Sequence, residues 1–221
     1  LGGTGSYILD LVAKTPVKEI HIYDGDEFLQ HNAFRAPAAP SLEELKKMPK
    51  KVKYLRGRYS KMHRGVVAHD YHIDDTNVDE LRGMDFVFLS IDGGASKRNI
   101  VEKLEAFNIP FVDTGMGVEV ADESLVGIIR LTTSTTRQRE HVRTKNRIGF
   151  SEGNGEDDYS KNIQIADLNA LNATLAVIKW KKIFGFYKDF ESEHHSTYTI
   201  DGNMLHNEDK HETISTNSQI R

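Results

Sequence analysis

The sequence contains no cysteine among its 221 residues. This absence excludes disulfide bonds, cysteine-ligated zinc and a thiol nucleophile on the chain. No apolar run approaches the roughly 20 residues that a membrane-spanning helix needs. A charged and then apolar signal sequence is also missing from the first residues. From these absences we expect a cytoplasmic protein that does not act at a membrane.

A strong excess of charge of either sign is missing as well. The chain has 29 Lys and Arg against 33 Asp and Glu, which gives a formal net charge of -4. Proteins that bind nucleic acid normally carry a basic surface. We therefore expect a small-molecule or protein partner and no nucleic acid. A hydrophobic content of 38% over 221 residues is enough for one sizeable core.

Hydrophobic periodicity in the first half predicts helices that alternate with strands. The predicted helices are 6–14, 41–47, 50–63, 76–82 and 95–107, and the predicted strands are 18–23, 65–69, 85–91 and 109–113. This alternation is typical of an α/β protein with a Rossmann-like, doubly wound, mainly parallel sheet flanked by helices. Because a glycine-rich turn normally follows a buried strand, we also expect a first strand upstream of Leu1.

The second half is predicted to begin with a small antiparallel extension, formed by 116–121 and 125–131. A polar stretch at 132–162 follows, and its length predicts a mobile connection. After it, 163–184 is predicted as a buried helix and 196–201 as a last strand. We therefore expect one domain over 1–205 and a polar tail over 206–221.

Three glycines, Gly2, Gly3 and Gly5, stand at the beginning of the first predicted helix. Glycine allows the backbone to approach a phosphate closely, and a helix N-terminus offers unpaired N–H groups to an anion. Asp24 follows at the end of a predicted strand, where a carboxylate can accept hydrogen bonds from ribose hydroxyls. This pattern predicts a nucleotide site but fits an NAD-dependent oxidoreductase as well as an ATP-using enzyme. A tight turn without a ligand also remains open.

Four further sequence motifs help to distinguish between an oxidoreductase, an ATP-using enzyme and a turn without a ligand. From Asp24 to Arg35 the chain reads DGDEFLQHNAFR, so that D-x-D is followed by N-x-x-R. PKKV at 49–52, SIDGGASKRN at 90–99 and NIPFVDTGMG at 108–117 come next. In this order and spacing the motifs resemble the ubiquitin-activating-enzyme-like superfamily, which includes ThiF, MoeB and HesA. The resemblance covers most of residues 1–131.

The resemblance implies an ATP and Mg²⁺ site. It assigns the ribose to Asp24 and the triphosphate to Asn32 and Arg35, and a planar guanidinium suits phosphate oxygens. Lys51 would neutralise another phosphate, with Lys50 as an equally close neighbour. Asp92 would hold Mg²⁺, as carboxylates do beside substrate phosphates. The full implied ATP-binding set is Gly2, Gly3, Gly5, Asp24, Asp26, Asn32, Arg35, Lys51 and Asp92.

The resemblance also implies a reaction. In this superfamily the C-terminal carboxylate of a ubiquitin-like or sulfur-carrier protein attacks the α-phosphate of ATP, giving an acyl-adenylate and pyrophosphate. The catalytic residues would be Arg35, Lys51 and Asp92, which would offset the charge on the α-phosphate. The simpler members are homodimers, so a homodimer is expected. A scaffold that binds a ubiquitin-like partner without activating it is the remaining alternative.

The chain departs from the family pattern in several ways. Without cysteine it cannot hold the structural zinc of some members or form a thioester, so no zinc is expected. Ala36 stands where the family has a glutamine after the motif arginine. The connection at 132–162 matches the crossover loop that embraces the carrier tail, and its threonines are predicted to be ordinary loop residues, namely Thr132, Thr133, Thr135 and Thr136. His194 and His195 are expected to point to opposite faces of a strand and therefore not to share a metal.

Overall fold

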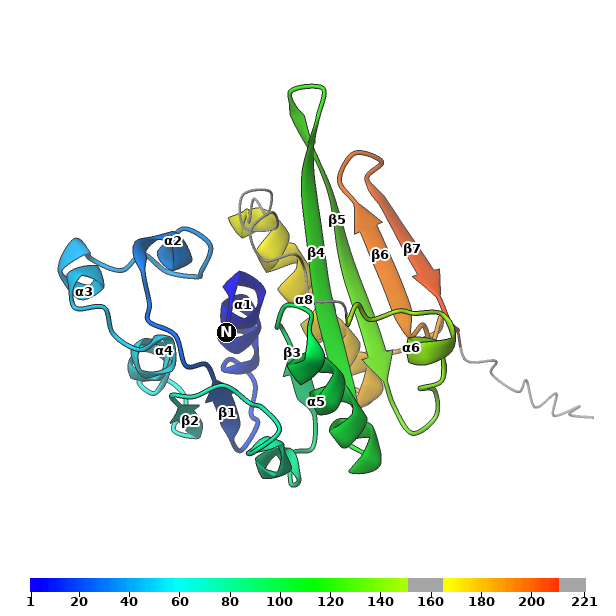
Figure 1. The fold of residues 1–221 in the computed structure, drawn as a ribbon, viewed down its shortest axis with the longest axis horizontal. Coiled ribbons are helices and arrows are strands. Elements are labelled where there is room, and N and C mark those ends of the chain that lie inside the picture. The colour runs from blue at the N-terminus through cyan, green and yellow to red at the C-terminus, as the bar shows by residue number, and fades with distance from the viewer. Residues whose placement is uncertain (151–164, 211–221) are drawn as a thin grey trace, which may run out of the picture.

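The computed structural model describes residues 1–150 and 165–210, and its fold is mixed α/β with two sheets (Figure 1). In the first sheet β1 (Ile20–Tyr23) pairs in parallel with β2 (Val66–His69). The second sheet has five strands in the order β3 (Val87–Leu89), β4 (Phe111–Ala121), β5 (Ser124–Ser134), β6 (His195–Thr199) and β7 (Met204–Glu208). β3 and β4 are parallel, and the remaining pairs are antiparallel.

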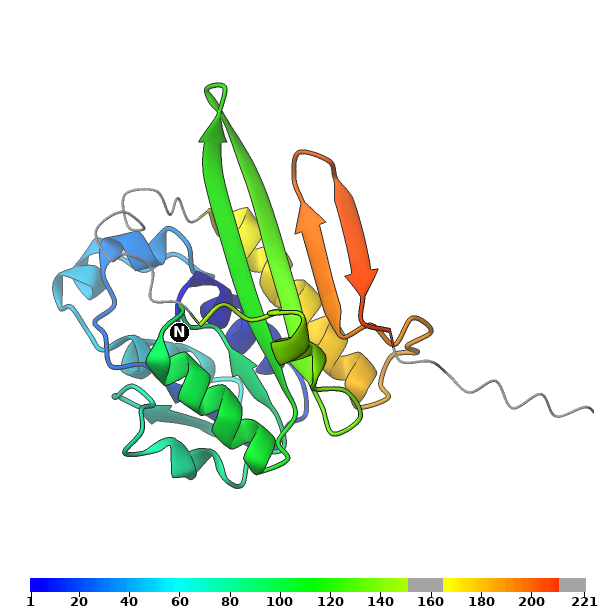
Figure 2. The same cartoon turned by 45° about the vertical axis from the view of Figure 1, so that its right-hand side comes forward.

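Two long helices cover opposite faces of the five-stranded sheet (Figure 2). α8 (Ala166–Ile183) lies on one face, and α5 (Ala95–Ala106) lies with the short α6 (His141–Thr144) on the other. The other helices are α1 (Gly3–Val12), α2 (Gln30–Ala33), α3 (Leu42–Lys46), α4 (Lys51–Tyr59) and the 3-10 helix η1 (Val78–Leu81). No helix within 1–150 or 165–210 is long and apolar enough to cross a membrane.

α1 joins the two sheets because its apolar side chains enter two separate clusters. Leu9 packs with Ile22 and Val66 of the first sheet. Ile8 and Val12, on another side of the same helix, pack in a cluster with residues of β4, β5 and α8. A helix of 10 residues can pack against both sheets only if apolar side chains project from more than one side of it. The N-terminus of α1 is therefore held between the two halves of the molecule.

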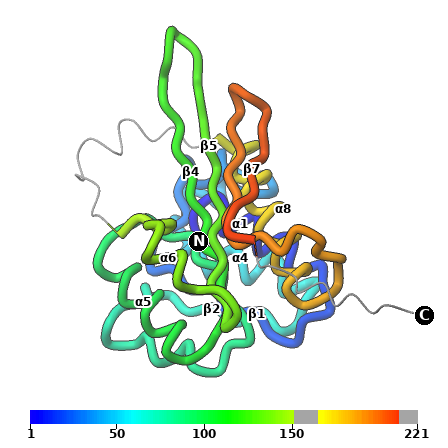
Figure 3. Tube along the Cα trace, turned by 90° about the vertical axis from the view of Figure 1, so that its right-hand side faces the viewer, coloured from blue at the N-terminus to red at the C-terminus, as the bar shows by residue number. Residues whose placement is uncertain are grey.

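The antiparallel part is larger than the sequence analysis predicts. The stretches 109–113 and 116–121 form one continuous strand, β4, and its hairpin with β5 extends well beyond the rest of the molecule (Figure 3). The prediction of an α/β fold is confirmed, but the prediction of a mainly parallel sheet is wrong for the described residues. Neither β1 nor β3 pairs with a strand on its second edge within those residues, and the upstream strand stays a prediction.

The boundaries of the polar connection and the tail also need correction. Thr132 and Thr133 are buried residues of β5 and not loop residues. The segment after them forms α6 and places Val142 and Ile148 in the core, both 0% exposed. Residues 151–164 lie outside the described part. The predicted tail at 206–221 begins inside β7, because the polar residues after Leu205 show no strand pattern.

α8 is shorter than the predicted helix and is not buried all round. It begins at Ala166, and Ile178 on its outer side is 37% exposed. Its buried side carries two asparagines, Asn169 and Asn172, beside small alanines. Asn172 Nδ2 donates to the carbonyl of Gly115 at 3.0 Å, which fixes the helix on β4.

Candidate nucleotide site

The glycine turn leaves an open space in front of α1. A Cβ atom on Gly2 would meet no atom within 4 Å, whereas one on Gly3 would lie 2.6 Å from the Asn169 side chain. Thr4 Oγ1 also donates to Asn169 Oδ1 at 2.8 Å, so this turn is pressed against α8. The first N–H groups of a helix lack partners within the helix. Gly3 therefore allows close packing, and Gly2 leaves open space at the N-terminus of α1, where a helix favours an anion.

The end of β1 brings three of the predicted site residues together. Asp24 is 5% exposed, and its Oδ1 accepts the backbone N–H of Asp26 at 2.8 Å. Lys51, the first residue of α4, places Nζ 2.7 Å from Asp26 Oδ2 and 3.4 Å from Asp24 Oδ2. The hydrogen bond from Lys51 lowers the pKa of Asp26. Lys50 donates instead to the carbonyl of Gly25 at 2.8 Å. Both lysines thus face the D-x-D turn.

The N-x-x-R motif lies on and just after the short helix α2. Asn32 is buried, and its Oδ1 accepts the N–H of Leu29 at 2.9 Å, which caps the helix. Arg35 lies two residues after the helix and is half-buried. The pKa of His31 is lowered first by burial and then by the positive charges of Arg35 and Lys51. His31 is therefore close enough to Arg35 and to Lys51 for both positive charges to contribute to this lowering of its pKa.

Asp92 follows β3 in the turn that leads to α5. Gly94, which precedes the helix, has a φ of 112°, a conformation that favours glycine. The Asp92 side chain is exposed and makes no hydrogen bond or ion pair within the described residues. Ser90, two residues earlier, lies against α1, because a Cβ on Gly5 would be 3.4 Å from Ser90 Cβ. Asp92 therefore stands near the glycine turn with its carboxylate available to a cation.

Further polar residues lie beside this turn, and the sequence analysis does not single them out. Ser90 Oγ and Thr114 Oγ1 are 3.2 Å apart, which links the ends of β3 and β4. Lys97 on α5 is 4% exposed and forms an ion pair with the fully buried Asp113 of β4 at 2.7 Å. Arg130 of β5 forms the second ion pair of Asp113, also at 2.7 Å. The signal available in the sequence is a carboxylate inside the apolar stretch FVDTG at 111–115.

The two histidines at the beginning of β6 are held by threonines of β5. His194 Nδ1 lies 2.8 Å from Thr133 Oγ1, and His195 Nδ1 lies 3.0 Å from Thr132 Oγ1. Burial lowers the pKa of His195 to about 4. In the described part of the chain no three His, Asp or Glu side chains converge as metal ligands. These histidines therefore belong to the packing of the sheet.

Together these groups fit a phosphorylated nucleotide with a divalent cation. Lys50, Lys51, Arg35 and the N-terminus of α1 are positive or partly positive, and phosphate oxygens are the ligands that suit them. Asp24 is a buried acceptor whose Oδ1 accepts the N–H of Asp26 and whose Oδ2 lies 2.6 Å from the Leu1 nitrogen and 3.4 Å from Lys51 Nζ, so a ribose hydroxyl would share these oxygens. Mg²⁺ prefers carboxylate and phosphate oxygens, and Asp92 offers such a carboxylate.

Comparison with known proteins gives a match in structure alone. No family model and no curated sequence matches the chain. E. coli MccB solved with AMPCPP and MccA has a TM-score of 0.69 at 18% sequence identity, over 97% of this chain and 63% of MccB. E. coli MccB with ATP has a TM-score of 0.67 at 17% identity, with 97% and 63% covered. PaaA has a TM-score of 0.67 at 15% identity, with 96% and 62% covered.

The chain thus spans less than two thirds of the length of these proteins. An identity below 20% carries information about the fold alone, and the match extends over nearly all of this chain. The chain shares its fold with E. coli MccB, which has been solved with ATP, and with PaaA.

Proposed function

We propose that the chain catalyses ATP-dependent adenylation of a C-terminal carboxylate. The observation that carries this proposal is the arrangement around Asp24. The buried carboxylate at the end of β1 lies beside Lys51, and its Oδ2 is 2.6 Å from the nitrogen of Leu1, the residue before the open turn at Gly2. A ribose on Asp24 would direct the phosphates of ATP towards Lys51, Arg35 and the helix N-terminus. The shared fold with MccB, which adenylates the peptide MccA with ATP, supports the same reaction.

The proposed chemistry requires positioning and charge stabilisation rather than a covalent enzyme intermediate. A substrate carboxylate oxygen attacks the α-phosphorus, the bond to the β-phosphate oxygen breaks, and pyrophosphate leaves. Lys51 would exchange Asp26 for a phosphate oxygen, and Arg35 would contact the phosphates from the segment just after α2. Mg²⁺ would neutralise charge on the phosphates when it is bound. Asp92 is the side chain that would hold it.

We propose a ubiquitin-like or sulfur-carrier protein as the source of the carboxylate. The superfamily resemblance supports a carrier protein, and MccB bound to MccA supports the idea that a short peptide suffices. The carboxylate would in both cases arrive on an extended C-terminal tail. A homodimer and a cytoplasmic location stay predictions. Because the chain has no cysteine, the product would remain a free adenylate and not become a thioester on this chain.

Substitutions at Arg35 and Asp92 test the proposal. Arg35→Ala and Asp92→Asn should each slow carrier-dependent ATP–pyrophosphate exchange by about 100-fold or more, the scale seen when one electrostatic stabiliser is removed. Asp24→Ala should weaken ATP binding instead, since a ribose contact is equal in ground and transition states. Asp122→Asn, at the tip of the β4–β5 hairpin, is the control for a lost carboxylate.

The alternatives predict different results in the same assays. A scaffold would bind ATP without pyrophosphate exchange, and an oxidoreductase would bind NADH in preference to ATP. Folded Arg35→Ala and Asp92→Asn proteins with normal exchange would show that the site has been assigned wrongly.

A further inference from the structure

A group of three charged residues, two of them buried, connects the Asp92 turn to the centre of the five-stranded sheet. It consists of Lys97 on α5, Asp113 on β4 and Arg130 on β5, which we call the Lys97–Asp113–Arg130 triad. The side chain of Asp113 is 0% exposed and that of Lys97 is 4% exposed. Burying a charge costs folding free energy unless the charge is paired, and here Asp113 pairs with both Lys97 and Arg130.

Lys97 makes a second contact that reaches the candidate site. Its Nζ donates to the carbonyl of Ile91 at 3.2 Å, and Ile91 directly precedes Asp92. The turn from Ile91 to Gly94 is otherwise exposed, apart from Gly94 itself. One buried ammonium group therefore ties this turn to Asp113 at 2.7 Å.

Arg130 fixes the far side of the triad. Its Nη2 lies 2.7 Å from Asp113 Oδ2, and its Nη1 donates to Thr132 Oγ1 at 2.9 Å and to the carbonyl of Arg147 at 2.6 Å. A Cβ on Gly115 would lie 2.6 Å from the same Nη2, so β4 has no side chain where the guanidinium passes. These contacts fix the guanidinium of Arg130, which in turn fixes the carboxylate of Asp113. Lys97 therefore pairs with an acceptor whose position is fixed.

We infer that Lys97 is a positioning residue for Asp92, and that the triad fixes the backbone from which the Asp92 carboxylate binds Mg²⁺. This inference rests on the proposed adenylation function. Lys97 need not touch ATP, because it acts through the carbonyl of Ile91. Partners that orient a metal-binding carboxylate typically change metal affinity or activity by 10–100-fold when they are removed.

The test compares Lys97→Met, Lys97→Arg and a control, Lys103→Met. Lys103 lies on the same helix, is 42% exposed and forms an ion pair with Asp79. In Lys97→Met the pair between Asp113 and Arg130 remains, so the fold should persist, which thermal unfolding checks. The amide of Arg98, which donates to the carbonyl of Gly94 at 3.2 Å, should exchange about 10-fold faster without any nucleotide present, because the turn that carries its acceptor loses a tether. The Mg²⁺ concentration for half-maximal pyrophosphate exchange should rise about 10-fold with little change in the KM for ATP.

Rescue distinguishes positioning from a general loss of stability. Lys97→Arg keeps the charge and a donor, so both measurements should return to within about 3-fold of the wild type. Asp113→Asn removes the charge that directs Lys97 and should loosen 91–94 in the same way. It therefore provides a second route if Lys97→Met does not fold.

Unchanged exchange of the Arg98 amide in Lys97→Met would overturn the inference, and so would a loosened turn with an unchanged Mg²⁺ requirement. Because amide exchange needs no substrate, failure of this inference can be told apart from failure of the proposed function. A wild-type protein without pyrophosphate exchange contradicts the adenylation proposal, and the exchange rate of the Arg98 amide still decides whether Lys97 tethers the turn.

Discussion

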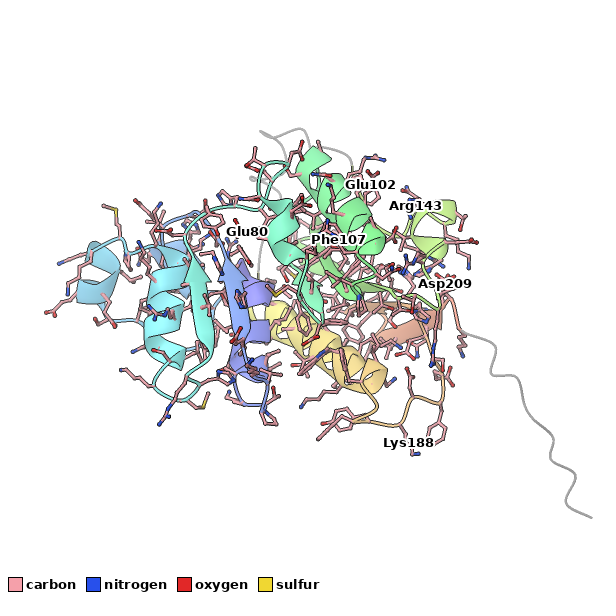
Figure 4. The ribbon with its side chains drawn as sticks, turned by 90° about the horizontal axis from the view of Figure 1, so that it is seen from below. Glu80, Glu102, Phe107, Arg143, Lys188 and Asp209 are labelled. Carbon is pink, nitrogen blue, oxygen red and sulfur yellow. The ribbon has the colours of Figure 1, made fainter. Side chains whose placement is uncertain are left out.

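Ionisable residues with low exposure form one group near the candidate nucleotide site and a second group at the end of β7, on the opposite edge of the five-stranded sheet. At that end Asp209, directly after β7, pairs with Lys145 and with Arg147, the latter at 2.9 Å. Arg143 of α6 and Asp209 lie at the same end of the sheet (Figure 4). The ion pairs join the segment after β5 to β7 and surround His195 with charge.

His195 should make the protein sensitive to mild acid. Burial first, and then the charges of Arg147 and Arg130, lower its pKa to about 4, whereas Glu208 and Asp209 oppose this shift. An unfolded histidine has a pKa of about 6.5. Between these two values unfolding takes up a proton, so the stability present above pH 6.5 is lost as the pH falls towards 4. The unfolding temperature should therefore decrease over this range.

His195→Gln should show a shallower decrease of the unfolding temperature between pH 6.5 and 4.5, because it removes the group that takes up the proton. His206→Gln, on the exposed part of β7, is the matched control and should keep the slope of the wild type. Equal slopes for both variants would show that His195 does not control the acid response. His141, whose pKa is also lowered mainly by burial, contributes to the slope that remains, as do His31 and His69.

Some residues of the site were predictable from the sequence, and others were not, for a physical reason. Asp24 and Asp26 belong to one short motif and Lys51 to another, and the carboxylates of both aspartates lie within 3.4 Å of Lys51 Nζ. Lys97, Asp113 and Arg130 come from three elements, and only the pairing of β3 with β4 and of β4 with β5 brings them together. The phosphate and Mg²⁺ contacts themselves stay predictions.

At the scale of elements, the approach of α1 to α8 positions the glycine turn. Gly3 allows the backbone of α1 to reach Asn169, and Ala173 and Ala176 of α8 are both 0% exposed in the same interface. The position of the turn relative to β3 depends on this contact. Packing between the two helices is thus a condition for an open space in front of Gly2.

Gly3→Ala and Gly2→Ala should separate packing from binding. In Gly3→Ala the new Cβ overlaps the Asn169 side chain, and overpacking typically costs about 1–3 kcal/mol of unfolding free energy. Gly2→Ala meets no neighbouring atom and has a φ of -73°, so stability should change little. Its methyl group would enter the space proposed for phosphate, so ATP affinity should fall.

Denaturant unfolding and ATP titration check both variants. If Gly2→Ala lowered stability as much as Gly3→Ala, the assignment of separate roles would be wrong. Unchanged ATP affinity in Gly2→Ala would remove the glycine turn from the proposed site.

The elements that the sequence analysis mispredicted share a cause. Glycines at 115 and 117 resemble a turn between two strands, yet Gly115 gives room to Arg130 and β4 continues through both. β7 has the sequence MLHNE, whose two apolar residues are adjacent, and within the described residues it pairs only with β6, so no hydrophobic alternation marks it. Strand pairing decides both cases, and the local sequence contains no signal for it.

At the scale of the whole molecule, the candidate site lies between two halves. Asp24, Lys51 and Arg35 come from the part built around β1 and β2, and Asp92 comes from the part built around the five-stranded sheet. The helix α1 belongs to both cores. A nucleotide that contacts Asp24 and the Asp92 turn together would therefore connect both halves.

Mg²⁺ with a non-hydrolysable ATP analogue should raise the unfolding temperature of the chain without any carrier protein. A ligand that binds only the folded state adds about 2.7 kcal/mol of stability at 100 times its dissociation constant. Asp24→Ala should lose this stabilisation, because the ribose contact is lost. Asp92→Asn should keep the part that occurs without Mg²⁺ and lose the additional part that Mg²⁺ provides. NADH should have no comparable effect, and stabilisation by NADH in place of ATP would favour the oxidoreductase alternative. If Asp92→Asn retained the full Mg²⁺-dependent increase, the nucleotide would contact only the half that holds Asp24, and Asp92 could not be its metal ligand.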